Sequence, residues 1–299
     1  MRWARILDGL GHRVSISEEA DGAGADMMVA VHAWRSAGSI RTFAERRPDR
    51  PLVVLLAGTD VYRFQHSHPE ETLASMEQAT LLVGLHDLVH RAIPGRFAGK
   101  LRVIHQSALP LPGPRTPSKR HFEICVVGHL REEKDPLRAA YAARLAAPES
   151  RLRVIQLGKA HDGDWARAAE AEIADNPRYA WRGEVTGGQV RRQLARSHAM
   201  VISSVMEGGA NVVSEAVIAG LPVIASRIDG NLGLLGEDYA GYYPAEDTEA
   251  LAGLLRRAED EPELLTLLAK QCRKRQPLFR PARERAAWRN LLAEIKRGS

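Results

Sequence analysis

A pair of glycines beside two glutamates is the part of the sequence best suited to binding a ligand. Gly208 and Gly209 leave the backbone bare, so a ligand can approach the peptide groups closely. A helix is predicted to follow and to run to about Ala219, with Asn211 as its N-cap and as a ligand-binding residue. The free N–H groups at the start of such a helix suit a phosphate.

Two carboxylates, those of Glu207 and Glu215, flank the mouth of this predicted loop. A carboxylate repels phosphate but accepts hydrogen bonds from hydroxyl groups, which sugars provide. A nucleotide sugar, in which a diphosphate joins two polyols, presents both kinds of group. The alternative is a glycine-rich turn with two solvated glutamates.

The spacing of these two glutamates, E-x7-E, resembles that of retaining glycosyltransferases of the group 4 type, which have the two-domain GT-B fold. The resemblance implies that Glu207 contacts the donor sugar at the catalytic centre and that Glu215 contacts the ribose. It also implies that the amides of Gly208, Gly209 and Ala210 face sugar hydroxyls and the diphosphate.

A second segment, Val127–Asp135, resembles the G-R-L-x-x-x-K-G motif of the same family, whose arginine and lysine hold the diphosphate. Lys134 matches the lysine, which implies that it offsets the charge of the leaving group. His129 stands where the motif has arginine, and Asp135 where it has the last glycine. We expect Arg131 to supply the missing cation. The alternative for Lys134 is an exposed lysine at a helix start.

The N-terminal half contains a third segment, Leu56–Tyr62, which resembles the H-G-x-D motif of the wider family, with Ala57 where the histidine is usual. Asp60 is expected either to bind substrate or to cap a turn. His32, at the end of an earlier strand, is expected to be structural. Three arginines are candidates for holding an acceptor phosphate, with surface solvation as the alternative: Arg35, Arg63 and Arg227.

Local matches along most of the chain together resemble the selenosugar synthases of the selenoneine pathway. They lie at 57–62, 128–136, 176–179, 207–215, 225–236 and 239–243. The resemblance implies transfer of a sugar from UDP-N-acetylglucosamine or UDP-glucose to selenophosphate. Selenophosphate is already an anionic nucleophile and needs no general base, and no His–Asp pair is obvious in the sequence. No metal or cofactor is expected, because no cluster of ligand side chains has metal-binding spacing.

Two other functions stay open. One is a glycosyltransferase of the same fold that acts on a lipid or polysaccharide, with a basic tail docked to an anionic membrane. From Lys270 onward the chain has ten Lys and Arg against two Glu, whereas its overall net charge is +5. The other is a non-catalytic protein that binds nucleotide sugars. For the tail we expect a solvated helix face, without nucleic-acid or integral membrane contact.

The fold that must position these residues is indicated by apolar runs that alternate with helix-length segments, as in parallel sheets covered by helices. Strands are predicted at 13–17, 26–32, 52–56, 81–85, 101–106, 122–127, 152–157, 179–181, 199–203 and 222–225, and helices at 135–146 and 188–196 among others. A proline-rich linker at 108–120 divides the two series. We therefore expect an α/β protein of the GT-B fold, with two Rossmann-like doubly wound domains facing a central cleft. Their ranges are 1–112 for the acceptor side and 121–275 for the nucleotide sugar, followed by a C-terminal helix at 276–299.

The sequence opens in a predicted helix, Arg2–Leu10, whereas a doubly wound domain usually opens with a strand and a glycine-rich turn. We expect the first strand of the N-terminal domain to be missing. The alternative is a domain that never had this strand.

The cellular compartment is indicated by the cysteines and by the apolar runs. Cys125 and Cys272 cannot form a disulfide framework, and no apolar run reaches the roughly 18 residues of a membrane span. We expect a protein of the reducing cytoplasm.

Overall fold

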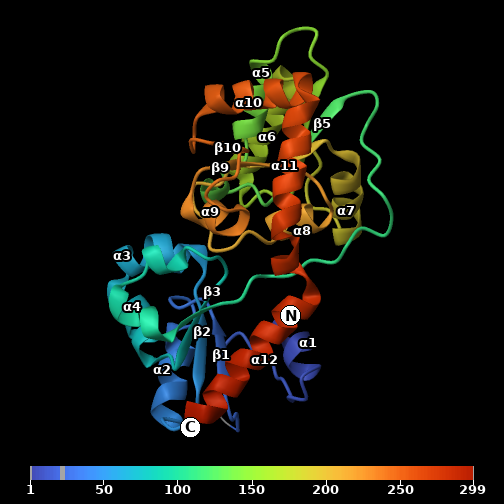
Figure 1. The fold of residues 1–299 in the computed structure, drawn as a ribbon. Coiled ribbons are helices and arrows are strands. Elements are labelled where there is room, and N and C mark those ends of the chain that lie inside the picture. Colours follow the sequence, from blue (N-terminus) through green and yellow to red (C-terminus); the bar gives the residue numbers. More distant parts are fainter. Residues whose placement is uncertain (1, 21–23, 299) are drawn as a thin grey trace. The chain divides into compact units, whose positions relative to one another are not determined.

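A computed structural model describes residues 2–20 and 24–298 and divides the chain into two compact units. Unit 1 comprises residues 1–106 and 281–299, and unit 2 comprises residues 107–280. Each unit is built on one parallel β-sheet (Figure 1). The predicted α/β class with two parallel-sheet domains is therefore confirmed.

Sheet A, in unit 1, has four parallel strands in the order of the sequence. These are β1 (Met28–Val31), β2 (Leu52–Leu55), β3 (Leu81–Gly84) and β4 (Leu101–Val103). The helices are α1 (Arg2–Asp8), α2 (Ala37–Arg46), α3 (Gln65–Ser67), α4 (Pro69–Gln78) and α12 (Pro281–Gly298), with shorter turns η1 (Asp60–Phe64), η2 (Val89–Arg91) and η3 (Gly95–Lys100). The C-terminal helix thus belongs to the same unit as the first 106 residues.

Sheet A separates two apolar cores. Successive side chains of a strand point to opposite faces. Leu52 and Val54 therefore pack with α2 and α4, whereas Val53 packs with α1 and α12. On that second face, Trp288 of α12 is fully buried and lies 4.7 Å from Trp3 of α1, ring centroid to centroid.

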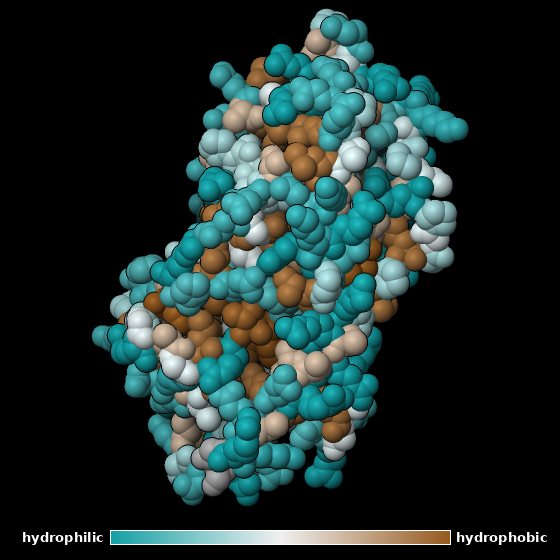
Figure 2. Space-filling view, viewed as in Figure 1, coloured by the Kyte–Doolittle hydropathy of each residue, from teal (hydrophilic) through white to brown (hydrophobic). Residues whose placement is uncertain are grey.

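The basic tail continues into α12, which covers sheet A with its apolar side. Arg283, Arg289 and Lys296 are exposed, as expected for a solvated helix face. Hydrophilic residues also dominate the face of the molecule shown in Figure 2. Among the described residues, no helix is both long and apolar enough to cross a bilayer.

The strand predicted at 13–17 is wrong. This segment has no regular structure, and Val14 and Ile16 are exposed. A strand needs a partner for its backbone groups. Sheet A ends at β1, and no further strand of the described chain pairs with that edge.

Sheet B, in unit 2, has six parallel strands in the order β10-β9-β8-β5-β6-β7. They are β5 (Phe122–Val127), β6 (Leu152–Leu157), β7 (Tyr179–Trp181), β8 (Ala199–Ile202), β9 (Val223–Ser226) and β10 (Tyr242–Tyr243), of which only β10 was not predicted. The helices are α5 (Arg138–Arg144), α6 (Gly163–Asp175), α7 (Gly187–Arg196), α8 (Asn211–Ile218), α9 (Asp229–Leu235), α10 (Thr248–Asp260) and α11 (Pro262–Arg275), with turns η4 (Glu132–Lys134) and η5 (Gln276–Phe279).

The strand order of sheet B reverses between β5 and β8. The chain winds outward from β5 through β6 to β7, then returns to β8 on the other side of β5. The reversal directs the connections after β5 and β8 away from each other and opens a crevice at the carboxyl ends of these strands. The two motifs singled out in the sequence follow these two strands.

Candidate functional site

A cavity of about 380 Å³ opens at the carboxyl ends of β5, β6 and β8. The loops after β5 and β8 both contribute to it, as the strand order requires. Of the predicted site residues, those that line the cavity are Arg131, Lys134, Glu207, Ala210 and Asn211.

Lys134 and Glu207, which are 73 positions apart in the sequence, meet in this cavity. The Nζ atom of Lys134 donates a hydrogen bond to Oε1 of Glu207, and Ser204 Oγ donates to the same oxygen at 2.6 Å. The side chain of Lys134 is 23% exposed and that of Glu207 is 7% exposed. The attraction between the two charges is stronger at such a partly buried site than in bulk water.

The two loops are also joined by hydrogen bonds to backbone carbonyl groups. Ser203 Oγ donates to the carbonyl oxygens of Lys134 and Asp135, at 3.1 and 2.8 Å, and the Val205 amide donates to the carbonyl of Glu133. Asp135 has φ 42°, a left-handed conformation that Asp tolerates better than most residues. Asp135 therefore adopts a conformation that favours glycine, at the position where the resembling motif has glycine.

Two of the residues that line this cavity each have a buried polar atom with no hydrogen-bond partner among the described residues. These atoms are Nε of Arg131 and Oε1 of Gln156, a donor and an acceptor. The nearest carboxylate to Arg131 is that of Glu133, at 3.8 Å from Nε. Buried polar groups are rarely left unpaired, so a polar ligand in the cavity would satisfy both. His129 also lines the cavity, and its Nδ1 accepts from the Lys159 amide at 3.2 Å.

The glycine pair leads directly into α8, but Asn211 is not its N-cap. Ala210 holds that position, and the Asn211 side chain donates instead to Oε1 of Glu215 at 2.7 Å. Residues four apart on a helix face each other, and this pairing competes with capping. Gly209 has φ 145°, which favours glycine. Glu215 does not line the cavity itself, and its contact with a ribose stays a prediction.

The run from Ser226 to Gly236 supports the Glu207 loop from behind. Ser226 Oγ donates to the carbonyl of Ser204 at 2.6 Å, and Asn231 Nδ2 donates to the carbonyl of Ser226 at 2.9 Å. A Cβ atom on Gly230 would lie 2.3 Å from the Glu207 carbonyl oxygen, so only glycine allows this approach. Arg227 lies outside the cavity lining; it is exposed, with its guanidinium 5.7 Å from the Tyr242 ring centroid.

The sequence analysis missed the part of the cavity formed after β6 and β7. Gln156, Gly158, Glu184 and Val185 line it there. A Cβ atom on Gly158 would lie 1.9 Å from the carbonyl oxygen of Gly128, so this glycine lets the loops after β5 and β6 touch. Their position at the carboxyl ends of two predicted parallel strands is the signal that could have identified them.

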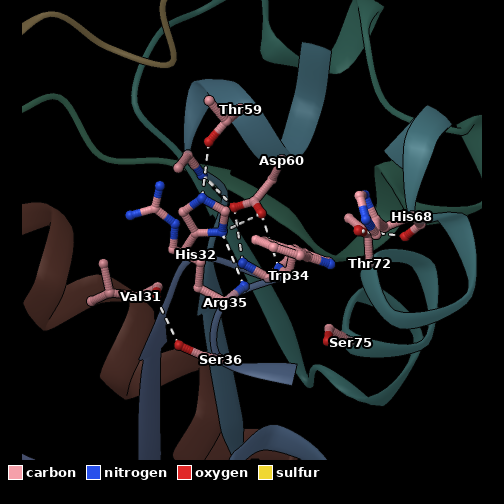
Figure 3. Close-up of polar contacts among 12 residues, drawn as sticks. Val31, His32, Trp34, Arg35, Ser36, Thr59, Asp60, His68, Thr72 and Ser75 are labelled. Atoms are coloured by element: carbon pink, nitrogen blue, oxygen red, sulfur yellow. Dashed lines mark hydrogen bonds and ion pairs between the residues drawn. The ribbon is translucent and has the colours of Figure 1, made fainter. Parts of the chain in front are cut away.

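The carboxyl edge of sheet A carries a His–Asp pair, which the sequence analysis did not find (Figure 3). His32 Nδ1 lies 2.6 Å from Asp60 Oδ1, and His32 Nε2 lies 2.9 Å from the Thr59 hydroxyl. Asp60 is fully buried and also accepts the backbone N–H groups of Ala33, Trp34 and Ala57. Asp60 thus caps the turn, one of its two predicted roles, and direct contact with a substrate stays a prediction.

His32 is held in an unusual conformation within this pair. Its φ of 81° lies in the left-handed region, which is strained for histidine. Phe64 packs against its ring, with 5.6 Å between centroids, and Trp34 stacks on Phe64 at 4.2 Å. These contacts hold the ring in one orientation, and the expectation that His32 is structural stays a prediction.

A second histidine lies at the end of β3. His86 is fully buried, and its Nε2 is 3.3 Å from the Tyr62 hydroxyl. Burial lowers the pKa of His86 to about 4. The ring is therefore neutral at physiological pH.

Comparison with protein families identifies the chain. Residues 114–275, more than half of the sequence, match the family Glycosyl transferases group 1. The protein belongs to this family. The matched segment contains both loops of the cavity in unit 2.

A curated relative of this glycosyltransferase chain is an Escherichia coli enzyme named UDP-Gal:alpha-D-GlcNAc-diphosphoundecaprenol alpha-1,3-galactosyltransferase. The two are 24% identical over 166 residues. The match covers 52% of this chain and 41% of the relative, so less than half of the relative's length is represented.

Solved structures share the fold of this group 1 chain. Anabaena Alr3699/HepE in complex with UDP superposes with a TM-score of 0.75 at 16% identity, covering 90% of this chain and 79% of the other. Sucrose-phosphate synthase from Thermosynechococcus elongatus superposes with a TM-score of 0.75 at 19% identity, covering 92% and 75%. At these identities the similarity shows the fold alone.

Proposed function

We propose that the protein is a glycosyltransferase that binds a UDP-sugar in the cavity of unit 2. The observation that carries the proposal is the Lys134–Glu207 pair inside a cavity that Arg131 also lines, with an Nε atom that has no hydrogen-bond partner among the described residues. The family and the UDP complex of the Anabaena protein support a nucleotide-sugar donor. UDP-N-acetylglucosamine and UDP-glucose are the two candidates.

Each charged group has a role in this proposal. Lys134 and Arg131 offset the charge of the diphosphate, which grows as UDP leaves. Glu207 accepts hydrogen bonds from sugar hydroxyls, and the amides of Gly208 and Gly209 face the same ligand. Glu215 accepts hydrogen bonds from the ribose hydroxyls. It also positions the Asn211 side chain through the hydrogen bond between them.

For the acceptor we propose selenophosphate, because of the sequence resemblance to selenosugar synthases. The selenium atom attacks C1 of the sugar, the C1–Se bond forms, and the C1–O bond to UDP breaks. UDP leaves with the electron pair of that bond. No proton has to be removed from the nucleophile, so the residues need only hold charge.

The test is an assay of UDP release from each of the two UDP-sugars, with selenophosphate as the acceptor. We expect UDP and a sugar that carries selenium, seen by mass spectrometry. UDP release only with hydroxyl acceptors would contradict the selenophosphate proposal. UDP binding without release for any acceptor would contradict the enzyme proposal and favour a binding protein.

The His32–Asp60 pair favours a second candidate, transfer to the hydroxyl of a lipid or polysaccharide. The name of the Escherichia coli relative includes such an acceptor. In this proposal the proton of the His32 ring is on Nδ1, which lies 2.6 Å from Asp60 and also 3.3 Å from the Arg35 amide, so that the Nε2 lone pair points toward Thr59. A hydroxyl acceptor in place of that of Thr59 would pass its proton to Nε2.

The two acceptors are separated by Asp60→Asn. With a hydroxyl acceptor we expect a loss of roughly a hundredfold or more, because the base loses its orienting carboxylate. With selenophosphate the loss should stay below about tenfold, since no base takes part. Turnover is measured against pH with each acceptor, and thermal melts check that the variant is folded. Equal losses with both acceptors would contradict the assignment of His32 as a base.

A further inference from the structure

A second hollow, of about 310 Å³, lies in unit 2 beside α7 and β5, both labelled in Figure 1. It shares no lining residue with the cavity proposed for the donor. Its volume falls at the lower end of the roughly 300–1,000 Å³ typical of small-molecule sites. Its charged and titratable lining residues are Arg120, His121, Glu123, Arg153, Arg182 and Arg196.

The strands of sheet B place several of these side chains on one face. Glu123 of β5 pairs directly with Arg153 of β6, and Ile155 pairs with Ala180 of β7. Paired residues of neighbouring strands share a face, and every second residue of a strand returns to it. Arg182, two positions after Ala180, therefore points to the same side as Arg153.

The only carboxylate in the lining is already neutralised. Glu123 is 4% exposed, and both of its oxygens lie 3.0 Å from Nε of Arg196. Gln193 Nε2 donates to Oε2 of Glu123 at 3.3 Å. This carboxylate has little capacity left for the other arginines.

Three guanidinium groups of the hollow consequently have no counter-charge within the part of the chain that the structure describes. Arg120, Arg153 and Arg182 have no hydrogen-bond or ion-pair partner for their side chains among residues 2–20 and 24–298. Arg120 and Arg153 line the same hollow as His121, and burial together with their charges lowers the pKa of this histidine. Positive charges held together in one hollow repel each other until an anion offsets them.

We propose that this hollow binds a phosphate-bearing anion. Guanidinium groups bind phosphate through two parallel hydrogen bonds, and three unpaired groups surround one space here. The imidazole ring of His121, which also lines the hollow, adds a further hydrogen-bonding group. The phosphate comes either from a small soluble compound or from a lipid head group, and the proposal does not depend on the function proposed for the other cavity.

The test is calorimetric titration of the full chain with inorganic diphosphate at about 0.15 M salt, where long-range surface attraction is largely screened. We expect Arg153→Gln to weaken binding roughly tenfold to a hundredfold, the loss of a charge-assisted contact. Arg192→Gln, an exposed arginine of α7 outside the lining, should change nothing. Lys134→Ala distinguishes the two sites. Lys134 lines only the other cavity, so we expect diphosphate binding in the hollow to survive this change.

Sedimentation with phosphatidic acid vesicles identifies the source of the phosphate. A lipid head group is assigned if the chain co-sediments with phosphatidic acid vesicles but not with phosphatidylcholine vesicles, and if Arg153→Gln abolishes this co-sedimentation. Binding of free diphosphate without co-sedimentation assigns a soluble compound. The proposal is overturned if the chain binds neither diphosphate nor these vesicles, or if Arg153→Gln and Arg192→Gln behave alike.

Discussion

The carboxyl edges of the two sheets hold their charged groups in opposite ways. In unit 2 the Lys134–Glu207 pair borders an open cavity, with Lys134 about one quarter exposed. In unit 1 the His32–Asp60 pair is enclosed, and Asp60 has no exposed surface. The first arrangement suits direct contact with an ionic ligand, whereas the second suits the orientation of a single ring.

The difference also lies in what holds each pair. In unit 2, glycines allow the close packing of the loops around the site. Gly158 and Gly230 approach the backbones of Gly128 and Glu207 at distances that a Cβ atom would prevent. A buried carboxylate carries the site of unit 1, through three backbone N–H groups. Variants of Gly158 and Gly230 should therefore weaken use of the donor. Variants of Asp60 should instead weaken use of the acceptor.

The largest effect is expected for Lys134→Ala. The developing charge of the leaving UDP loses a cation, so turnover should fall by about a hundredfold to a thousandfold. Affinity for the UDP-sugar should fall less, because the charge grows toward the transition state. Single-turnover rates and calorimetry measure the two quantities. Lys270→Ala, an exposed lysine of α11, is the control; equal losses in rate and affinity would contradict the role.

Gly230→Ala tests the support behind Glu207. Because the new Cβ would meet the Glu207 backbone, we expect a destabilisation of about 1–3 kcal/mol and a loss of turnover of up to about a hundredfold. Gly253→Ala, inside α10 with open space around it, should instead stabilise by roughly 0.5–1 kcal/mol. Thermal melts and turnover are measured for both variants. Similar behaviour of the two would contradict the close approach as the cause.

His86 makes the stability of unit 1 depend on pH. Its pKa is about 4 in the folded chain and about 6.5 when unfolded, so the unfolded state binds the proton first as pH falls. Its contribution is complete above pH 6.5 and declines toward pH 4, by about 2 kcal/mol between pH 7.5 and pH 5. Denaturant unfolding of the wild type and His86→Gln at both pH values checks this. An equal pH dependence in the two chains would show that His86 is not responsible.

The sequence predicts the parallel strands well where each one is buried on both faces, as β2 and β5 are. The strand prediction fails at 13–17. Alternating apolar residues such as Val14 and Ile16 form a strand only where a neighbouring strand can pair with their backbone groups. Lys134 and Glu207 could be predicted because each lies in a motif of fixed local spacing. His32 and Asp60 could not be paired from the sequence, since they are 28 positions apart and follow two different strands, β1 and β2.

The N-cap of α8 is a second feature that the sequence pattern does not predict correctly. Asn211 has the side chain of an N-cap, yet a glutamate one turn later offers it a better partner. Whether Asn caps or pairs depends on where the preceding loop starts the helix. Here the helix begins at Asn211 with Ala210 as its N-cap, directly after the two glycines, and the residue types alone do not fix this start.

Calorimetric titration of UDP tests the central claim, that the cavity of unit 2 binds the donor. We predict that the wild type binds UDP and that Glu215→Ala binds it roughly tenfold to a hundredfold more weakly, the value of one charge-assisted hydrogen bond. Glu249→Ala, an exposed glutamate of the same unit, and Asp60→Asn in unit 1 should bind UDP as the wild type does. A wild type that binds no UDP, or a Glu215→Ala variant that binds it unchanged, would contradict the account.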